Sequence, residues 1–303
     1  MSSLPEEMSL YGFVVLNYNN YYDTIACVDS ILRIRHRDDY RIVIVDNASS
    51  NNSVVALKKM YGEHAKIEFA ITDENTGYSG GNNVGLKILR DIGINRFIIA
   101  TNDTEVVSLD LLDEFDKIDI GTVGIVGPDI LSLDGAHQNP PLYQLTFIYL
   151  LNLYFYAPMV WMRAKIYKHI PVLANLRRSA KAKNLEKFTA NGDAMNGYSV
   201  YMLHGCFMYL TKTYIEKVGL LDENLFMYGE EDLMAWNCTQ HQLLEWYLPS
   251  VKVLHKDAQA TKLVHQKGKD DFVRAMTMKA IPYLTKRIKA WHLIKHMLTG
   301  SQR

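Results

Sequence analysis

The chain has 303 residues, of which 48% are hydrophobic, enough for one large domain or for one domain with an appendage. Basic and acidic residues both number 33, so no overall charge favours nucleic acid as a partner. The three cysteines, Cys27, Cys206 and Cys238, are far apart and include no CxxC pair, which argues against a disulfide framework or a zinc site and suits a reducing compartment. The first ten residues contain Glu6 and Glu7 but no basic residue, so we expect no signal peptide and a cytoplasmic protein.

Short apolar runs alternate with helical spacing from residue 11 to residue 104. The pattern predicts strands at 13–16, 42–45, 67–71 and 97–100, and helices at 25–32, 54–60 and 80–90. The strands lack a polar alternation and are separated by helices. This arrangement predicts a parallel sheet that is covered by helices on both faces.

Each predicted strand ends in polar residues. These are Asn17, Asp46 with Asn47, Asp73 to Asn75, and Asn102 with Asp103. One such end would indicate only a turn, because turns favour asparagine and aspartate. The carboxyl ends of parallel strands meet at one edge, where sheets of this kind bind ligands, so four such ends predict a site.

The glycine-rich loop is not where a dehydrogenase would carry it. A dinucleotide site needs G-x-G-x-x-G directly after the first strand, and the chain has Asn17-Tyr18-Asn19-Asn20 there. The loop at 75–85 instead follows the third strand. Its glycines would let backbone approach a ligand, and the helix that follows would favour negative charge.

Seven segments in a fixed order resemble family 2 glycosyltransferases of the GT-A fold, and most closely the rhamnosyltransferase-like branch of bacterial polysaccharide biosynthesis. They cover about residues 11–261 apart from a poorly matching middle, and read VVLNYNNYYDTIACVDSIL, IVIVDNASSNNS, NTGYSGGNNVG, ATNDTEV, VGIVGPDIL, GCFMYLTKTYIEKVGLLDENLFMYGEEDL and VLHKDAQAT. The resemblance implies an α/β fold: a Rossmann-like nucleotide-binding sheet with helices on both faces, a helical insertion and a C-terminal amphipathic helix.

The same resemblance implies the domain plan. A GT-A catalytic domain would occupy residues 1–265, with a nucleotide-sugar-binding half at 10–135, an acceptor- or membrane-facing insertion at 136–200, and a half with the acceptor site and the base at 201–265. A basic amphipathic segment would follow at 266–303.

The donor-binding residues are also implied by the resemblance. Expected contacts to the nucleotide-sugar are Asn17, Tyr18, Asp46, Asn75, Gly77, Asn83, Asn102 and Asp103. Asp103 matches the second carboxylate of the metal motif D-x-D, and Thr101 stands where the first would be. With His255, Asp103 would hold Mg²⁺ or Mn²⁺ on the diphosphate, since such ions often use one or two protein carboxylates plus phosphates.

The acceptor half carries three adjacent acids at 230–232. By resemblance, Glu231 aligns best with the catalytic base of an inverting enzyme. Asp232 is the next candidate, because the segment is one residue shorter than the common form G-E-D-x-D-L. Glu230 completes the cluster. The alternative is an acidic first turn that stabilises a helix at 233–240 through its dipole.

Two segments raise the question of membrane contact. Residues 142–162 carry no charge, but active-site motifs lie on both sides of them, so they are not expected to span a bilayer. The basic stretch 163–187 follows, and together they predict docking on an anionic membrane surface, with an inserted helical pair packed on the core as the alternative.

The C-terminus repeats this composition. Residues 272–303 contain seven basic residues and no acid, and apolar residues recur at 281, 284, 288, 291, 294 and 298. The spacing predicts an amphipathic helix that begins near Pro282. Its apolar face would lie on a membrane, on the catalytic domain, or on a second subunit in a homodimer.

The sequence therefore predicts an inverting glycosyltransferase, peripheral on the inner face of the cell membrane. It would transfer a sugar from a dTDP- or UDP-linked donor, with dTDP-L-rhamnose first and UDP-hexoses as the alternative, to a hydroxyl of a lipid-linked or polysaccharide acceptor. A sugar-nucleotidyltransferase would need a basic, glycine-rich loop after the first strand, which is absent. A non-catalytic sugar-nucleotide-binding protein remains the third hypothesis.

Overall fold

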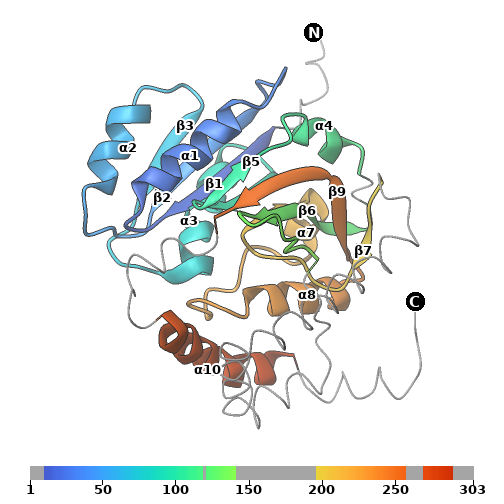
Figure 1. The fold of residues 1–303 in the computed structure, drawn as a ribbon. Helices are drawn as coiled ribbons and strands as arrows, with labels where there is room; N and C mark the ends of the chain where they lie inside the picture. The colour runs from blue at the N-terminus through green and yellow to red at the C-terminus, as the bar shows by residue number, and fades with distance from the viewer. Residues whose placement is uncertain (1–9, 119–120, 141–195, 257–268, 289–303) are drawn as a thin grey trace, which may run out of the picture.

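The computed structural model describes residues 10–118, 121–140, 196–256 and 269–288. In this part of the chain a nine-stranded sheet forms the centre, and helices cover its two faces (Figure 1). The N-terminal elements are β1 (Tyr11–Asn17), α1 (Tyr21–Leu32), β2 (Tyr40–Asp46), α2 (Ser53–Tyr61), β3 (Ile67–Ile71), α3 (Gly77–Asp91), β4 (Arg96–Thr101), β5 (Thr104–Val106) and α4 (Leu111–Asp116). The later elements are β6 (Val123–Ser132), β7 (Tyr198–Val200), β8 (Phe207–Leu210), α7 (Lys212–Lys217), α8 (Glu230–Gln240), β9 (Leu244–His255) and α10 (Lys269–Arg287).

The first four long strands are parallel, as predicted. The sheet runs in the order β3-β2-β1-β4-β8-β6-β9-β5, and β7 pairs with β9. β1 pairs in parallel with β2 and β4, and β2 with β3. β8 then enters antiparallel between β4 and β6, which attaches the second half of the chain to the half that contains β1 to β4.

The parallel strands β1, β2 and β4 are buried on both faces. In β1, Phe13 and Val15 face one apolar cluster together with α1 and α2, while Val14 faces another together with α3. This explains why the strands read as continuous apolar runs. Because the four strands run parallel, their carboxyl ends all lie at one edge of the sheet.

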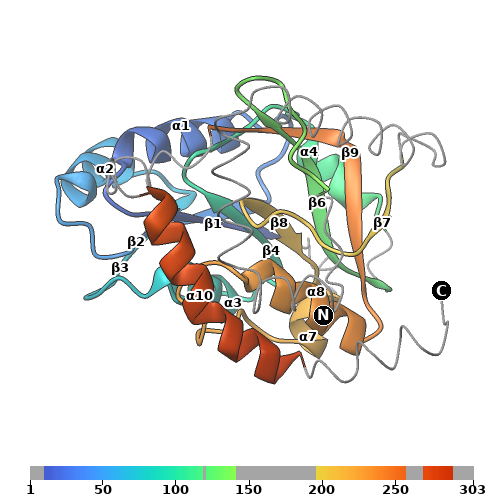
Figure 2. The same cartoon turned by 60° about the horizontal axis from the view of Figure 1, so that its bottom comes forward.

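The C-terminal helix differs from the prediction. It begins at Lys269, and Pro282 lies inside it instead of at its start. Ala280, Leu284 and Ile288 are buried against a small apolar cluster that includes Leu233 and Trp236 of α8. In both views α10 lies alongside the body of the domain (Figures 1 and 2), so this part of its apolar face is already covered.

Several predictions fall outside the described residues. They are the uncharged segment 142–162, the basic stretch 163–187, and the apolar positions 291, 294 and 298 of the C-terminus. Among the helices that the structure does describe, none combines the length and the apolar character needed to cross a bilayer.

Candidate active site

The ends of β1, β2 and β4 meet around the buried side chain of Asn17. Its Nδ2 donates to Asp46 Oδ2 at 2.6 Å and to Ser49 Oγ at 3.1 Å. Its Oδ1 accepts from Thr24 Oγ1 at 2.7 Å and from Asn102 Nδ2 at 3.5 Å. Because the amide is used on both sides, Asp46 and Asn102 are held at fixed positions beside it. Three of the expected donor-site residues therefore belong to one network.

The glycine-rich loop is held by Asn47, which the sequence analysis treated only as part of a strand end. Asn47 Nδ2 donates to Asn75 Oδ1 and to the Gly77 carbonyl, both at 3.0 Å. Its Oδ1 accepts the Thr76 N–H at 3.0 Å and the hydroxyl of Thr72 at 3.2 Å. Asn75 thus lies next to the end of β2. The signal for Asn47 in the sequence is its place directly after Asp46.

Two loop residues, Gly77 and Asn83, contact the second half of the chain. Gly77 has φ +75°, and a Cβ there would lie 1.9 Å from the Phe226 carbonyl oxygen, so only glycine fits. Asn83 donates to the Leu221 carbonyl and to Glu223, both at 2.8 Å, and accepts the Leu221 N–H at 3.0 Å. Both residues therefore join the two halves of the domain, a role that the motif did not predict.

Tyr18, which was also expected to contact the donor, is half-buried just beyond the end of β1. It follows Asn17 directly, so it lies at the rim of the network formed by the strand ends. An aromatic ring in that position can stack on a nucleotide base.

Asp103 and His255 come together across two antiparallel strands. Thr104, at the start of β5, pairs with His255 at the end of β9, and the Asp103 Oδ2 atom lies 3.4 Å from His255 Nε2. Both side chains are buried. His255 Nδ1 lies 2.7 Å from Gln138 Oε1; an amide oxygen only accepts, so the Nδ1–H donates to it.

Asp103 is kept ionised in this setting. Burial raises the pKa of its carboxyl, but the hydrogen bond and charge of His255 and the Thr101 hydroxyl outweigh burial, and the net pKa lies below the ordinary value. Thr101 Oγ1 donates to Asp103 Oδ1 at 2.7 Å. An ionised carboxylate oxygen and an imidazole nitrogen 3.4 Å apart fit neighbouring ligands of one divalent cation with bonds of about 2.1 Å.

The three acids begin α8, which starts at Glu230 and not at 233 as predicted. Burial and the charge of Glu231 raise the pKa of Asp232 to about 7. Burial, followed by the same charge, raises the pKa of Glu230 to about 8. The acidic first turn that was weighed as an alternative is therefore present. However, its helix N-terminus does not offset the cost of burying these carboxylates.

Only two of the three acids face a cavity. A cavity of about 230 Å³ is lined by Glu231 and Asp232 on one side and by Ala280, Ile281 and Leu284 of α10 on another. Glu230 points away from it, into a much smaller space beside Tyr214 and Leu221. Glu231 and Asp232 are therefore the acids that a molecule in this cavity could reach.

The tripeptide His204-Gly205-Cys206 links the acids to the pair of Asp103 and His255. The Gly205 N–H donates to Glu231 Oε1 at 3.2 Å. The neighbouring Cys206 carbonyl accepts the Thr101 N–H at 2.8 Å, and Thr101 in turn holds Asp103. Gly205 and Cys206 belong to one of the segments that carry the family resemblance, but nothing local in the sequence shows what lies beside them.

A family model for glycosyl transferase family 2 matches residues 13–219. The chain belongs to glycosyl transferase family 2. Over 221 residues it is 25% identical to the low-salt glycan biosynthesis hexosyltransferase Agl10 of Haloferax volcanii. The match covers 73% of this chain and 58% of Agl10, so the family 2 chain spans a little over half of the length of that relative.

Solved structures with the same fold are GT-A glycosyltransferases. GalNAc-T7 with UDP, GalNAc and Mn²⁺ has a TM-score of 0.57 at 13% identity, covering 83% of this chain and 44% of that one. The mannosyltransferase PcManGT of Pyrobaculum calidifontis, with GDP-Man and Mn²⁺, has a TM-score of 0.54 at 12% identity, covering 97% and 76%. TarS 1-349 of S. aureus with UDP has a TM-score of 0.52 at 12% identity, covering 84% and 63%. These likenesses confirm the GT-A fold for this family 2 chain.

Proposed function

We propose that the chain is an inverting glycosyltransferase that moves a hexose from a nucleoside diphosphate to an acceptor hydroxyl. The observation that carries the proposal is the tripeptide 204–206, which contacts the acid Glu231 through Gly205 and the Asp103–His255 pair through Cys206 and Thr101. Inverting transfer needs a base beside the acceptor hydroxyl and a positive charge beside the leaving diphosphate. These two groups lie on opposite sides of the anomeric carbon. The tripeptide sets that spacing.

In this reaction Glu231 removes the proton of the acceptor hydroxyl as its oxygen attacks the anomeric carbon of the donor. The bond from that carbon to the diphosphate oxygen breaks, and the diphosphate leaves with the electron pair. A divalent cation, Mg²⁺ or Mn²⁺, held by Asp103 and His255 would offset the charge that develops on the diphosphate. Asp232, with a pKa of about 7, shares the cavity with Glu231 and is the second candidate for the base.

The donor pocket is formed by the Asn17 network and the loop held by Asn47. Support for a nucleoside diphosphate hexose comes from the relatives: one is a hexosyltransferase, and the structures were solved with UDP or GDP-Man. We keep dTDP-L-rhamnose as the first donor, on the sequence resemblance, and UDP-hexoses as the alternative. One methyl or hydroxyl distinguishes such donors, and a few pocket contacts are enough to select between them.

The acceptor would enter the cavity beside Glu231. Its α10 side is apolar, contributed by Ala280, Ile281 and Leu284, and its opposite side is acidic. Such a wall suits the apolar face of a sugar ring with its hydroxyl directed at the acids. A lipid-linked or polysaccharide acceptor, with the enzyme on the inner face of the cell membrane, is our inference for the rest of the substrate.

In this proposal, segments 142–162 and 163–187 dock on the membrane. The described part of α10 does not, because it packs on its own domain. Co-sedimentation with anionic and neutral vesicles tests it: binding that depends on anionic lipid supports docking, and equal recovery in the supernatant contradicts it. The same preparation, measured by light scattering, gives the oligomeric state and so tests the homodimer.

The central experiment compares Glu231→Gln and Asp232→Asn with the wild type. We expect Glu231→Gln to bind the nucleotide-sugar with unchanged affinity by calorimetry and to lose transfer and slow donor hydrolysis by at least about a hundredfold. If Asp232→Asn shows that pattern and Glu231→Gln does not, the base is Asp232. If both variants and the wild type bind donors without any turnover, the chain is a sugar-nucleotide-binding protein and the proposal fails.

The donor and cofactor are tested by a panel of dTDP-, UDP- and GDP-sugars, each with Mg²⁺, with Mn²⁺ and with chelator. The proposal predicts one preferred donor, and turnover that requires a divalent cation. Asp103→Asn should raise the cation concentration needed for half-maximal turnover, whereas an unchanged requirement would remove Asp103 from the metal site.

A further inference from the structure

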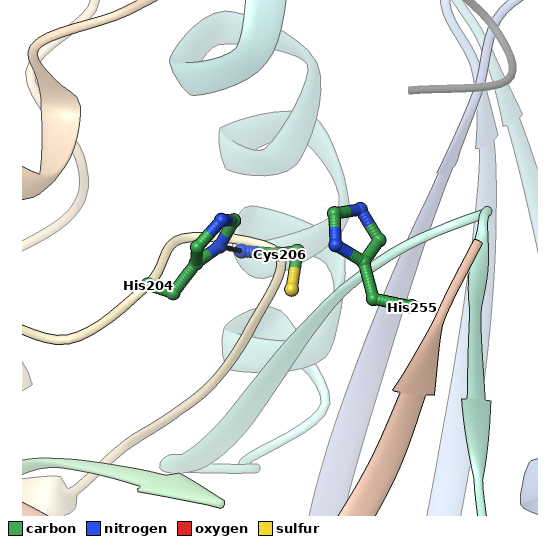
Figure 3. Close-up of side chains that lie close together, drawn as sticks. All are labelled: His204, Cys206 and His255. Atoms are coloured by element: carbon green, nitrogen blue, oxygen red, sulfur yellow. Dashed lines mark hydrogen bonds between the residues drawn. The ribbon is translucent and has the colours of Figure 1, made fainter. Parts of the chain in front are cut away.

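Three side chains with nitrogen and sulfur donors gather beside the site. Cys206 Sγ and one ring nitrogen each of His204 and His255 all lie within 4.8 Å of one another (Figure 3). Cys206 and His255 are buried, and His204 is partly exposed. The ring centroids of the two histidines are 5.5 Å apart.

Long-range contacts create this cluster. His204 and Cys206 lie just before β8, two residues apart, and His255 ends β9, while β6 pairs with both β8 and β9. The sequence argued against a zinc site because no CxxC pair is present. The fold instead supplies one thiol and two imidazoles from two separate segments.

We propose that His204, Cys206 and His255 form a second, thiophilic cation site, of the kind that Zn²⁺ or Co²⁺ occupies, and that it shares His255 with the donor-metal site. Thiolate and imidazole are the donors that such ions prefer, whereas Mg²⁺ and Mn²⁺ favour oxygen. Zinc sites with three or four such ligands are tetrahedral.

The geometry needs only a small closure. With Zn–S bonds of about 2.3 Å and Zn–N bonds of about 2.0–2.1 Å, tetrahedral ligands lie about 3.3–3.6 Å apart. The cluster therefore has to contract by about one ångström, and the partly exposed His204 ring is the member with most room to move. His204 Nδ1 accepts the Cys206 N–H at 3.2 Å, so the ring either gives up this bond or binds through Nε2 after a change of tautomer.

Binding also releases a proton. The thiol Cys206–SH loses its proton to solvent as the sulfur–metal bond forms, so the affinity weakens as the pH falls. No oxidant or reductant takes part.

Sharing His255 has a consequence for catalysis, and this part rests on the proposed function. A cation bound to Cys206 and His204 also uses the His255 ring as a ligand, so thiophilic ions compete with Mn²⁺ for this histidine. Occupation of the site by Zn²⁺ then lowers transfer, and excess Mn²⁺ restores it.

Two measurements test the site. In the first, the full chain is titrated with Co²⁺, because thiolate ligation gives a charge-transfer band in the near ultraviolet. In the second, the chain competes with a chromophoric chelator for Zn²⁺, which gives the Zn²⁺ affinity. We expect one equivalent with the thiolate band in the wild type. Cys206→Ala should lose the band and bind Zn²⁺ at least about tenfold more weakly. Cys238→Ala is the matched control: Cys238 is equally buried but lies on α8, outside the cluster, and the band should remain.

His204→Gln extends the test to a partly exposed residue whose replacement leaves the core unchanged, in case Cys206→Ala does not fold. It should keep the thiolate band and weaken Zn²⁺ binding by about tenfold. A wild type without the band, or a band that persists in Cys206→Ala, overturns the proposal. The metal-binding measurements need no turnover, so they test the cation site even if the chain does not transfer sugar. If Zn²⁺ binds as expected but does not inhibit an active enzyme, only the proposed competition between Zn²⁺ and Mn²⁺ is overturned.

Discussion

Gly205 and Glu231 are in direct contact: the Gly205 N–H donates to Glu231 Oε1 at 3.2 Å, and a Cβ on Gly205 would lie 2.6 Å from the same oxygen. The Gly205 carbonyl in turn accepts the hydroxyl of Tyr78 in α3. The carboxylate proposed as the base is therefore positioned by backbone that is anchored to α3. Any side chain at 205 would push it away.

Replacing Gly205 by alanine should impair the chemical step more than donor binding. The new methyl group displaces the end of a flexible side chain, so the fold should survive with a loss of about 1 kcal/mol, while kcat should fall at least about tenfold because the base is misplaced. Steady-state kinetics with varied donor separates kcat from KM. Equal changes in kcat and donor KM would contradict a positioning role.

A double substitution provides the control. In the Glu231→Ala background the added methyl at Gly205 has no oxygen to meet, so Gly205→Ala should cost less stability there than in the wild type. Denaturation of the four proteins gives this coupling directly. Additive stability losses would show that the two residues do not interact.

Asn47→Ala should loosen the glycine-rich loop. The change removes the side chain that holds Asn75, Gly77 and Thr76 and leaves buried polar groups unpaired, so we expect a loss of about 2–3 kcal/mol in unfolding free energy. Donor affinity should fall about tenfold. Asn52→Ala, nearby and exposed, makes no side-chain cap bond to α2 and is the control; equal losses in both variants would remove Asn47 from this role.

Glu230→Gln should stabilise the protein at neutral and alkaline pH. Burial and the neighbouring charge raise the pKa of Glu230 from 4.5 to about 8, so the folded protein holds a proton there that the unfolded chain releases. Its contribution to stability is complete below pH 4.5 and is lost as the pH rises to 8. The glutamine keeps the acceptor oxygen without the charge.

The stability difference between Glu230→Gln and the wild type should therefore grow between pH 5 and pH 8, to about 1–3 kcal/mol in favour of the variant, and level off above pH 8. Thermal unfolding across this range measures it. A difference that does not change with pH would mean that Glu230 is ionised in the folded protein throughout.

Leu284→Ala should destabilise the domain by about 2–4 kcal/mol, because Leu284 is buried in the cluster with Leu225 and Trp236. It should also enlarge the cavity beside Glu231. Met278→Ala, on the same helix but 45% exposed, should change stability by less than about 0.5 kcal/mol. If both variants behave like Met278→Ala, α10 is not docked on the domain and its apolar face is available for a membrane or a second subunit.

The strands and most helices were predictable because their signals are local. Apolar runs without alternation gave β1 to β4 and their parallel arrangement, and the strand ends pointed to Asn17, Asp46 and Asp103. The helix starts were less accurate. α8 begins in the acids themselves because the left-handed turn at Tyr228 and Gly229 comes directly before them.

The C-terminal helix shows a different limit. Its apolar spacing predicted one face of a helix correctly, but the same spacing serves a membrane, a partner or the chain's own core. The contact of Leu284 with Gly229, beside the acids of α8, becomes visible only when α10 is placed against the domain. Pro282 was a poor boundary marker because proline, although unfavourable inside a helix, does not forbid one whose face is buried.

Sequence alone was sufficient for the fold class, the family resemblance and the edge of the sheet that carries the site, since these depend on periodicity and on motifs of a few neighbouring residues. It could not supply the roles of Asn47 and Gly205, the link between Asn83 and Leu221, or the gathering of His204, Cys206 and His255. Each of these depends on contacts between segments about 25 to 140 residues apart. Such contacts arise from how strands and helices pack, and no local pattern in the chain encodes them.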